Sequence, residues 1–555
     1  MSKTAVFLAV AALIARPSSG ARAEELLARG EVEKGEYRLD ATAAKSLSFC
    51  ISNHDQSPSH PVLFPIIGRT NVVFRANGSR LVVNGQAVVF YIAESRNVRL
   101  EGFEVEPVRP VMTEMTIVGF RDGGTLVRVD RDRYPFVLRD GRIVMTGPGW
   151  ESGVGGAKTF DGRTREMIAL SGDTMYDGAA EEAEDGLLLL KCDFKGVGTG
   201  MKAGDIVVLR PRKRPMPCIV VANSSGVELV DVIVHDAQGM ALVAQHAENV
   251  SWRGTAPASS RKCGVFPSAG RYSSMHADAT HFSNVKGEVV VENCLFEGMM
   301  DDAINVHSTC LKIVGTGGGN VLRCRHMHEQ AVGFDVFRPG ERLRFIRGRT
   351  LENGPEAVVV SLRRLDEREV ELALDRPMPP PFGTGDAVEN ADYQPSAVFR
   401  GNIVRNNRAR AALFTTLRPV LCEDNLFERV TGSAVLLAGD SSIWYESGAC
   451  RDVTIRGNVF SNCCTSARSH GFCKGVISIC PTVKDLGGQR EPYHRNVRIT
   501  GNDFFTFDVP LLYARSATNV VFDANRVVRN SDYPGWGEPE IVSSVPVLKA
   551  DGQRR

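Results

Sequence analysis

The chain has 555 residues, with 66 Lys and Arg against 65 Asp and Glu, so its formal charge is +1. A chain of this length is too long for one ordinary compact core, which predicts several domains or a repeat architecture. A charge so near zero gives no long-range field to hold nucleic acid or an anionic membrane surface, so neither is expected as a partner.

The first residues have the composition of a signal peptide. Lys3 precedes an apolar run over residues 5–15, and Ala21 and Ala23 are small residues of the kind that flank a cleavage point. We therefore expect a signal peptide over residues 1–23 and export to the periplasm or the extracellular space. No stretch reaches the roughly 18 apolar residues of a transmembrane helix, so no membrane span is expected.

A short phrase recurs along the chain: alternating apolar residues, then often Gly or Asp, then Asn, then two apolar residues. Clear copies contain Asn402, Asn425, Asn458, Asn502 and Asn525. Short strands punctuated by residues that tolerate left-handed backbone angles are typical of a parallel β-helix. Asparagines at equivalent turns can also bond from one coil to the next. We therefore predict an all-β fold, a right-handed parallel β-helix.

Two stretches interrupt this phrase with ordinary alternating strands and Gly-rich turns. We interpret them as two inserted small antiparallel β-barrel or sandwich domains. A short helix over residues 42–47 is a candidate to cover the end of the β-helix. The predicted organisation is residues 1–23 as signal peptide, 24–106 as N-terminal β-helix coils, 107–215 as the first barrel-like insert, 216–311 as coils with the catalytic centre, 312–396 as the second barrel-like insert and 397–555 as C-terminal coils.

Three aspartates are predicted to meet on neighbouring coils. Asp278 and Asp301 are 23 residues apart, the same interval as between Asn402 and Asn425, and adjacent strands lie about 4.8 Å apart. Asp302 follows at a position where a later coil has small residues. Because like charges repel, at least one of these groups should keep its proton to a higher pH, as a general acid requires. We predict a catalytic cluster of these three aspartates.

Four further polar residues of the same two coils are candidate contacts for sugar hydroxyls: His276, His281, Asn305 and His307. Strand alternation places the last two outward, beside the acids. The first two flank Asp278 and could orient it by hydrogen bonds, or could instead satisfy buried backbone groups. A shift of 61 residues sets His246 on His307, so that histidine could belong to the coil pattern rather than to the site.

No metal and no cofactor are predicted. His276, Asp278 and His281 could bind a cation, but no fourth ligand is spaced to complete the site. The 13 cysteines are odd in number and mostly lie inside apolar strand patterns, so they are expected to be buried small hydrophobic residues. One cluster without zinc-site spacing could hold a disulfide: Cys463, Cys464, Cys473 and Cys480.

Three stretches carry a family resemblance: Asp278-Ala-Thr-His-Phe282, Gly287-Glu-Val-Val-Val-Glu-Asn293 and Asp301-Asp302-Ala-Ile-Asn-Val-His307. The chain resembles glycoside hydrolase family 110, bacterial α-1,3-galactosidases that remove terminal α-linked galactose from blood group B and related glycans. The resemblance implies an exported, inverting exo-galactosidase without cofactor that acts on terminal α-galactosyl oligosaccharides or glycoproteins. It implies Asp301 as general acid, with Asp278 and Asp302 as candidates to activate water.

Carboxylates on neighbouring coils could be separated by the roughly 6.5–9.5 Å that admits a water in inverting glycosidases, which favours inversion. Two other functions stay open. A polysaccharide lyase would need a Lys or Arg base near the acids, and only Lys286 is basic there, in what should be the opposite turn. A non-catalytic glycan-binding β-helix would need aromatic platforms, whereas the 4 Trp and 10 Tyr are scattered. No residue decides between branched B and linear α-galactosyl substrates, and the oligomeric state is not predicted.

Overall fold

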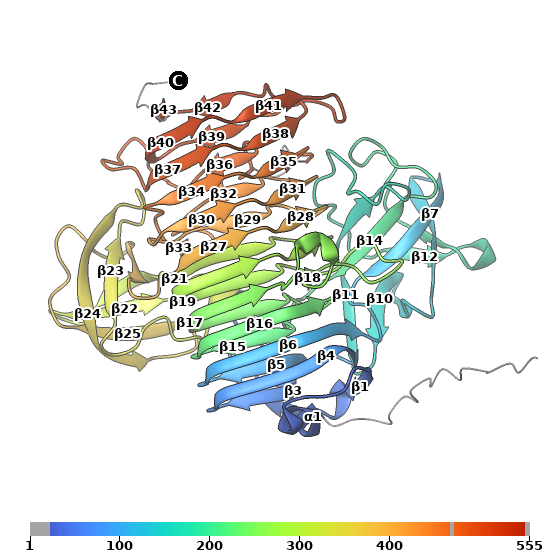
Figure 1. Cartoon of the computed structure of the whole chain (residues 1–555), viewed down its shortest axis with the longest axis horizontal. Coiled ribbons are helices and arrows are strands. Elements are labelled where there is room, and N and C mark those ends of the chain that lie inside the picture. The colour runs from blue at the N-terminus through green and yellow to red at the C-terminus, as the bar shows by residue number, and fades with distance from the viewer. Residues whose placement is uncertain (1–22, 467–470, 550–555) are drawn as a thin grey trace, which may run out of the picture.

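The computed structural model describes residues 23–466 and 471–549 (Figure 1). The predicted signal peptide, residues 1–23, lies outside the described residues apart from Ala23. Within the described part of the chain, no helix has the length and apolar character needed to cross a membrane. The chain forms a right-handed parallel β-helix with two antiparallel inserts, which confirms the predicted all-β fold class.

The β-helix has three faces of hydrogen-bonded parallel strands. The first face contains β3 (His60–Ile67), β5 (Val88–Ala93), β15 (Ile219–Ala222), β17 (Leu242–Arg253), β19 (Thr280–Glu292), β21 (Ile304–Thr316), β29 (Ala412–Phe414), β32 (Val435–Leu437), β36 (Ile477–Ile479), β39 (Leu512–Ala514) and β42 (Ile541–Ser543). Figure 1 shows the coils stacked along one axis from α1 (Ala23–Arg29) to β43 (Val547–Leu548).

The longer strands bend at a corner of the helix and contribute to two faces. The second face contains β4 (Thr70–Asn84), β6 (Arg96–Pro107), β16 (Ser225–Val234), the second halves of β17 and β19, β27 (Ser396–Arg400), β30 (Val420–Glu423), β34 (Val453–Arg456), β37 (His494–Thr500), β40 (Ala517–Asp523) and β43. The third contains β1 (Glu36–Asp40), the second halves of β4, β6 and β16, β18 (Gly264–Val265), β20 (Leu295–Glu297), β28 (Ile403–Arg405), β31 (Leu426–Glu428), β35 (Val459–Ser461), β38 (Asp503–Thr506) and β41 (Arg526–Arg529).

Turn asparagines form a continuous ladder in the C-terminal coils. The side-chain Nδ2 of Asn402 donates to Oδ1 of Asn425 at 3.1 Å, and Asn425 bonds in the same way to Asn458, Asn458 to Asn502 and Asn502 to Asn525, at 2.9–3.0 Å. The same oxygens also accept from backbone N–H groups of the preceding coil. The sequence prediction that these residues bond from coil to coil is therefore confirmed.

The residue before each ladder asparagine takes a left-handed backbone conformation. The φ angle is 65° at Gly401, 54° at Asp424, 65° at Gly457, 64° at Gly501 and 52° at Ala524. Gly adopts this conformation without steric cost, and Asp tolerates it better than most residues. This is why the recurrent phrase has Gly or Asp before Asn.

The first insert is an antiparallel sheet of eight strands with its own hydrophobic core. Its strands are β7 (Thr113–Arg121), β8 (Gly124–Val129), β9 (Phe136–Arg139), β10 (Arg142–Gly147), β11 (Trp150–Phe160), β12 (Ala180–Glu182), β13 (Leu188–Leu190) and β14 (Ile206–Pro211). The insert lies on the opposite side of the solenoid from the second one, at the right of Figure 1.

The second insert is a closed antiparallel barrel that begins with the end of β21. The ring closes because β21 pairs with both β22 and β26. The order of strands around the ring is β21, β22, β25, β24, β23 and β26. These strands are β22 (Val321–Arg325), β23 (Arg342–Ile346), β24 (Asn353–Arg364), β25 (Glu369–Leu374) and β26 (Ala387–Asn390). This barrel also has a hydrophobic core of its own.

One expectation about local structure needs correction, and the question of a disulfide is answered. The predicted helix over residues 42–47 is wrong: a single 3-10 turn at Ala41–Ala43 is followed by strand β2 (Lys45–Leu47), which pairs with β3. The end of the solenoid is instead covered by α1, which buries Leu26 and Leu27. None of the 13 cysteines, all of which lie in the described residues, forms a disulfide, and ten of them are buried.

Candidate active site

The catalytic cluster predicted from the sequence lies where two coils turn into the first face. Asp278 precedes β19, while Asp301 and Asp302 precede β21. These strands pair with Thr280 opposite Ile304. The interval across this coil is therefore 24 residues, one more than the spacing used for the prediction, and Asp278 lies next to Asp302 with Asp301 beside them.

The three carboxyl groups are close together and withdrawn from solvent. One oxygen from each lies within 4.8 Å of the others, and Asp278 and Asp302 are 3% and 0% exposed. This is tighter at the nearest atoms than the roughly 6.5–9.5 Å between the carboxyl groups of inverting glycosidases. The expected gap is not seen between the nearest oxygens, so this spacing does not support inversion.

Two arginines from the next coil neutralise part of this charge. Arg408 Nη1 donates to Asp301 Oδ2 at 3.1 Å, and Arg410 Nη2 donates to Asp302 Oδ2 at 2.7 Å. Arg410 Nη1 also lies 3.6 Å from Asp301 Oδ1. The pairing of β21 with β29 sets Ile304 opposite Ala412, which brings Arg410 beside Asp302. Two successive coils therefore carry acids, and the third carries the arginines that pair with them.

Burial and these ion pairs set the three aspartates to different protonation states. Burial and the neighbouring Asp301 raise the pKa of Asp278 to about 8. Burial also raises the pKa of Asp302 well above its usual value, although Arg410 opposes the shift. For Asp301, burial alone would raise the pKa, but Arg408 and Arg410 together hold it below the usual value. At neutral pH the cluster therefore contains a carboxylate, that of Asp301, beside the protonated carboxyl group of Asp278.

The first insert contacts the site through an arginine. Asp173, in the segment between β11 and β12, accepts a hydrogen bond from Arg408 Nε at 2.9 Å. The same guanidinium thus bridges Asp173 of the insert and Asp301 of the β-helix. The insert therefore fixes the position of a group that touches the catalytic cluster.

A cavity of about 450 Å³ opens beside the acids. Its wall includes Asp278, Asp301, Arg408 and Arg410 together with Ile443 and Trp444. Trp444 is 40% exposed, and its ring stacks on His328, a residue carried by the second insert, with 3.9 Å between ring centroids. A wall with both charged groups and an exposed aromatic ring suits a carbohydrate, which presents both hydroxyls and apolar ring faces.

The four predicted binding residues have different fates. His281 Nδ1 lies 2.8 Å from Asp278 Oδ2 and lines the cavity, and Asn305 also lines it. His276 is not among the described residues that line this cavity, and its Nδ1 lies 3.1 Å from the backbone carbonyl oxygen of Gln238. For His276 the alternative of satisfying buried backbone is therefore the one that the structure shows.

His307 is not the coil equivalent of His246. His307 lies opposite Ser283, which lies opposite Gln245 on the preceding strand. His246 has a φ of 48°, and its Nε2 lies 3.0 Å from Glu341 Oε1 of the second insert. His307 therefore aligns with Gln245, at a shift of 62 residues rather than 61. His307 instead contacts His281 and Glu446 behind the acids.

The sequence analysis missed Arg408, Arg410 and Glu446. The two arginines occupy a turn where other coils have small residues, which is the signal that identified the aspartates, but the second insert hides their distance from Asp302. The expectation that only Lys286 is basic near the acids is therefore wrong: Arg408 and Arg410 line the cavity, whereas Lys286 pairs with Glu248 at 3.4 Å and is not among the residues of its wall. A lack of basic residues near the acids is no longer a reason against a lyase.

Two sets of side chains in the described residues have atoms close enough to hold a cation. They are the three aspartates and the set His281, His307 and Glu446. The trio of His276, Asp278 and His281 considered from the sequence is not one of them. Arginines already pair with Asp301 and Asp302, so the positive charge that a metal would supply to the aspartates is present in the chain itself.

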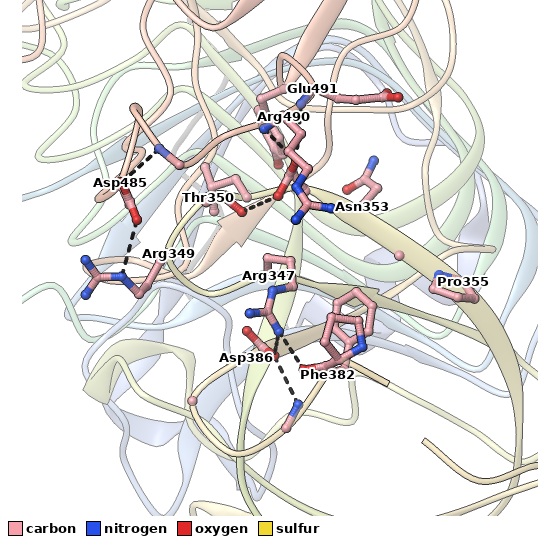
Figure 2. Close-up of a pocket in the computed structure, with 18 of the residues that line it drawn as sticks. Arg347, Arg349, Thr350, Asn353, Pro355, Phe382, Asp386, Asp485, Arg490 and Glu491 are labelled. Atoms are coloured by element: carbon pink, nitrogen blue, oxygen red, sulfur yellow. Dashed lines mark hydrogen bonds and ion pairs between the residues drawn. The ribbon is translucent and has the colours of Figure 1, made fainter. Parts of the chain in front are cut away.

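A larger cavity, about 1000 Å³, lies between the second insert and the C-terminal coils (Figure 2). Its charged side chains largely pair with one another: Arg347 with Asp386 at 2.6 Å and Arg349 with Asp485 at 3.8 Å. None of the three clustered aspartates reaches its wall. Size alone would favour this cavity, but its wall lacks paired acids in different protonation states, so the smaller cavity is the candidate active site.

Two family models match the two inserts of this chain. Residues 113–207 match the family model of the GLAA-B beta-barrel domain I, and residues 321–388 match that of domain II. Alpha-1,3-galactosidase B of Akkermansia muciniphila is 45% identical over 91% of this chain, which spans 63% of that relative. Alpha-1,3-galactosidase B of Parabacteroides distasonis is 35% identical and alpha-1,3-galactosidase A of Bacteroides fragilis 30%, over 91% and 92% of this chain and 82% and 83% of their own lengths.

Among solved structures, the tailspike of Acinetobacter baumannii bacteriophage AP22 is similar over 93% of this chain and 73% of its own, at 8% identity and a TM-score of 0.22. So low a score carries no argument about function. The relatives at 30–45% identity do identify the family, because they extend over both inserts and the coils that carry the acids. The chain belongs to the family of these α-1,3-galactosidases, glycoside hydrolase family 110.

Proposed function

We propose that this chain is an exo-acting galactosidase that hydrolyses terminal α-1,3-linked galactose with inversion at the anomeric carbon. The observation that carries the proposal is the meeting of Asp278, Asp301 and Asp302 beside one cavity, whose wall includes the first two, in a chain whose relatives bear the name alpha-1,3-galactosidase. A cavity of about 450 Å³ has the size usual for a small-ligand site and suits the end of a glycan.

Hydrolysis with inversion needs two carboxyl groups in opposite protonation states. One protonates the glycosidic oxygen, while the other takes a proton from a water that attacks the anomeric carbon from the opposite face. The resemblance gives the acid role to Asp301. The ion pairs of Asp301 with Arg408 and Arg410 favour the reverse, with Asp278 as the carboxyl that donates and Asp301 as the carboxylate that activates water.

The cavity wall suggests how the sugar is held. We assign contacts with galactose hydroxyls to Asn305, which lines the cavity beside the acids and has an Oδ1 without a hydrogen-bond partner among the described residues. Trp444 would pack against an apolar ring face of the next sugar, since an exposed indole at the rim offers that surface. The expected substrates are the branched blood group B determinant and linear α-1,3-galactosyl ends.

The activity is tested by incubating the protein with B trisaccharide and with linear α-1,3-galactobiose while proton NMR follows the released sugar. β-Galactose as the first product supports inversion, and the relative rates give the preference between branched and linear ends. α-Galactose as the first product would contradict inversion. Release of galactose from neither substrate would contradict the proposed activity, and an unsaturated product from a uronate polymer would support the lyase instead.

The acid and base roles are tested with two substrates that differ in their leaving group. The nitrophenolate of p-nitrophenyl α-galactoside leaves with little protonation. The sugar that leaves from galactobiose must be protonated by the general acid. If Asp278 is the acid, Asp278→Asn loses far more activity on galactobiose than on the nitrophenyl substrate, while Asp301→Asn loses both. Azide should then rescue Asp301→Asn and yield β-galactosyl azide. The opposite pattern would restore the acid role to Asp301.

We also propose that the protein is exported through the segment over residues 1–23. Expression of the full chain should yield a form recovered outside the cytoplasm whose N-terminal sequence begins near Glu24. Recovery of the uncleaved chain in the cytoplasm alone would contradict export.

A further inference from the structure

A chain of hydrogen bonds leads away from Asp278 into the protein. Asp278 Oδ2 lies 2.8 Å from His281 Nδ1, and His281 Nε2 lies 2.9 Å from His307 Nε2. His307 Nδ1 lies 3.1 Å from the backbone carbonyl oxygen of Ser308. Both histidines are 1% exposed, so these contacts are shielded from water. The two rings come from adjacent strands, β19 and β21, whose pairing fixes their distance.

The contacts determine how many protons the chain of groups holds. The carbonyl of Ser308 can only accept, so His307 Nδ1 carries a hydrogen. Each of the three links needs one hydrogen between its two heavy atoms, so Asp278, His281 and His307 together hold three protons. If one is removed, two lone pairs face each other across one of these links. Such a contact is unfavourable in a buried site, and the network therefore resists losing a proton.

The three protons have two arrangements. In the first, the Asp278 carboxyl donates to His281 Nδ1, and His281 Nε2–H donates to His307 Nε2. In the second, His281 Nδ1–H donates to the Asp278 carboxylate, and His307 is an imidazolium that donates to His281 Nε2. One converts into the other when two protons each cross one hydrogen bond, and no proton enters or leaves the set.

Glu446 is placed to stabilise the second arrangement. Its Oε1 lies 3.6 Å from His307 Nε2 and accepts a hydrogen bond from Asn53 Nδ2 at 2.8 Å. It belongs to the two-residue strand β33 (Glu446–Ser447), which pairs with β21. Burial would raise the pKa of Glu446, but His307 and His281 hold it below its usual value. Glu446 also lines the cavity, so it connects the buried end of the network with the site.

We propose that His281, His307 and Glu446 form a proton relay that keeps a proton on Asp278 at rest and lets it pass to His307 during the reaction. The three are positioning residues that act through Asp278. The inference rests on the proposed function only for the use that Asp278 makes of its proton. The other charged groups that face Asp278 are Asp301 and Asp302 before β21, Arg410 before β29 and Arg214 before β15.

The substitution His307→Gln tests the relay directly. A glutamine amide can rotate to donate or to accept, so it no longer fixes the number of protons, and Asp278 can ionise without opposing lone pairs. The pKa of Asp278 should then fall by about one unit or more. The limb of the pH-rate profile that Asp278 governs should move to lower pH, whether Asp278 acts as acid or as base. His307→Asn serves in the same way if the Gln variant does not fold.

A stability measurement reports the same pKa without any catalysis. Burial gives Asp278 a folded-state pKa of about 8, above its unfolded value. Its protonated form is favoured in the folded state, so stability is lost as pH rises from about 4, and the loss levels off at the folded-state pKa. The amide that Asp278→Asn introduces does not titrate. The stability difference between the wild type and Asp278→Asn, measured from pH 4 to 9, therefore gives the levelling point.

The same pair is then compared in the His307→Gln background. The relay predicts that the levelling point moves to lower pH by about one unit or more. His494→Gln is the matched control, because His494 is also fully buried on a coil but bonds to the backbone of Cys450, away from the acids. It should leave the levelling point unchanged. An unchanged levelling point in His307→Gln would overturn the relay, and this result does not depend on whether the chain cleaves galactosides.

Discussion

Two columns of turn residues in the same solenoid are held together in opposite ways. In the C-terminal coils, Asn402 to Asn525 repeat one residue type, and each amide both donates to the next and accepts from a neighbour. In the middle coils, Asp278 is followed by Asp302 and then by Arg410, and these turn residues with the neighbouring Asp301 and Asn305 are called the acid column. A carboxylate only accepts, so stacked carboxylates repel and need protons or arginines between them. A repeat can stack identical side chains only where the residue can bond to itself.

The columns also differ in what they leave unpaired. The ladder amides bond to one another and to backbone groups. In the acid column, buried oxygens of Asp301, Asp302 and Asn305 accept no hydrogen bond from any described residue. Leaving such atoms unpaired costs free energy. The ladder amides use their hydrogen-bonding atoms to hold the coils together, whereas these oxygens of the acid column remain able to accept hydrogen bonds.

The largest expected effect breaks the acid column chemically. Asp278→Asn and Asp301→Asn should each lower turnover of galactobiose by about three orders of magnitude, because each removes a proton-transfer group. Steady-state kinetics and circular dichroism would show an inactive, folded protein. The control is Asp503→Asn, whose carboxylate pairs with Arg526 at 2.8 Å on the exposed surface and should leave turnover unchanged. Near-normal activity in either site variant would contradict the assignment.

The next largest effect is expected when the positive charge of Arg410 is removed from the acid column. Arg410→Met leaves Asp302 buried without its partner and should lower the free energy of unfolding by about 3 kcal/mol. Asp302→Asn in the same chain should recover part of the loss, since no charge is then left uncompensated. Urea denaturation measures both. Arg526→Met, at the surface, should change the stability little, and an equally small effect of Arg410→Met would mean that the column does not depend on its arginine.

A smaller effect turns the ladder into an acid column. Asn458→Asp removes the Nδ2 that donates to Asn502 Oδ1 at 3.0 Å and to the carbonyl of Cys422 at 2.9 Å. Acceptors then face acceptors, and unfolding should become easier by about 2 kcal/mol, more so at pH 8 than at pH 5. Asn519→Asp is the control, because its Nδ2 bonds to Asn496 at the surface. If both substitutions have the same effect, the ladder does not stabilise the coils.

The smallest effect concerns the backbone under the ladder. Ala524 has a φ of 52°, where a side chain is strained, so Ala524→Gly should raise the free energy of unfolding by about 0.5–1 kcal/mol. Gly501→Ala should lower it by a similar amount. A Cβ at Gly501 would meet nothing within 4 Å, so its effect is conformational only. Thermal melts of both variants check the prediction, and a loss of stability in Ala524→Gly would refute it.

Most of the solenoid could be predicted from the sequence, because its signal is local. The left-handed turn before each asparagine selects Gly or Asp, and the strand after it alternates, so Asn402 and Asn502 stand out without any knowledge of the fold. The inserts were recognisable because they break that phrase. Asp278 and Asp301 were found by a spacing of 23 residues, which is within one residue of the actual coil of 24.

The rest of the site depends on register and on long loops, which local patterns do not encode. The pairing of β17, β19 and β21 aligns His307 with Gln245, one residue away from the His246 that the sequence suggested. Arg410 is separated from Asp302 by the second insert, and Glu446 lies on a two-residue strand with no recurrent phrase. The protonation states follow from burial and from these distant partners, so they too required the folded chain.

The hydrogen bond between Asn53 and Glu446 joins residues 393 positions apart. During synthesis, early coils can stack while later ones are still being made, but the hollow beside the aspartates has no far wall until Glu446 and Trp444 have been added. A chain stopped before them would resemble a finished solenoid in its spectrum and yet have nowhere to seat a sugar. As the chain matures, its β structure should therefore form well before its ability to bind a sugar, which should appear in a single late step.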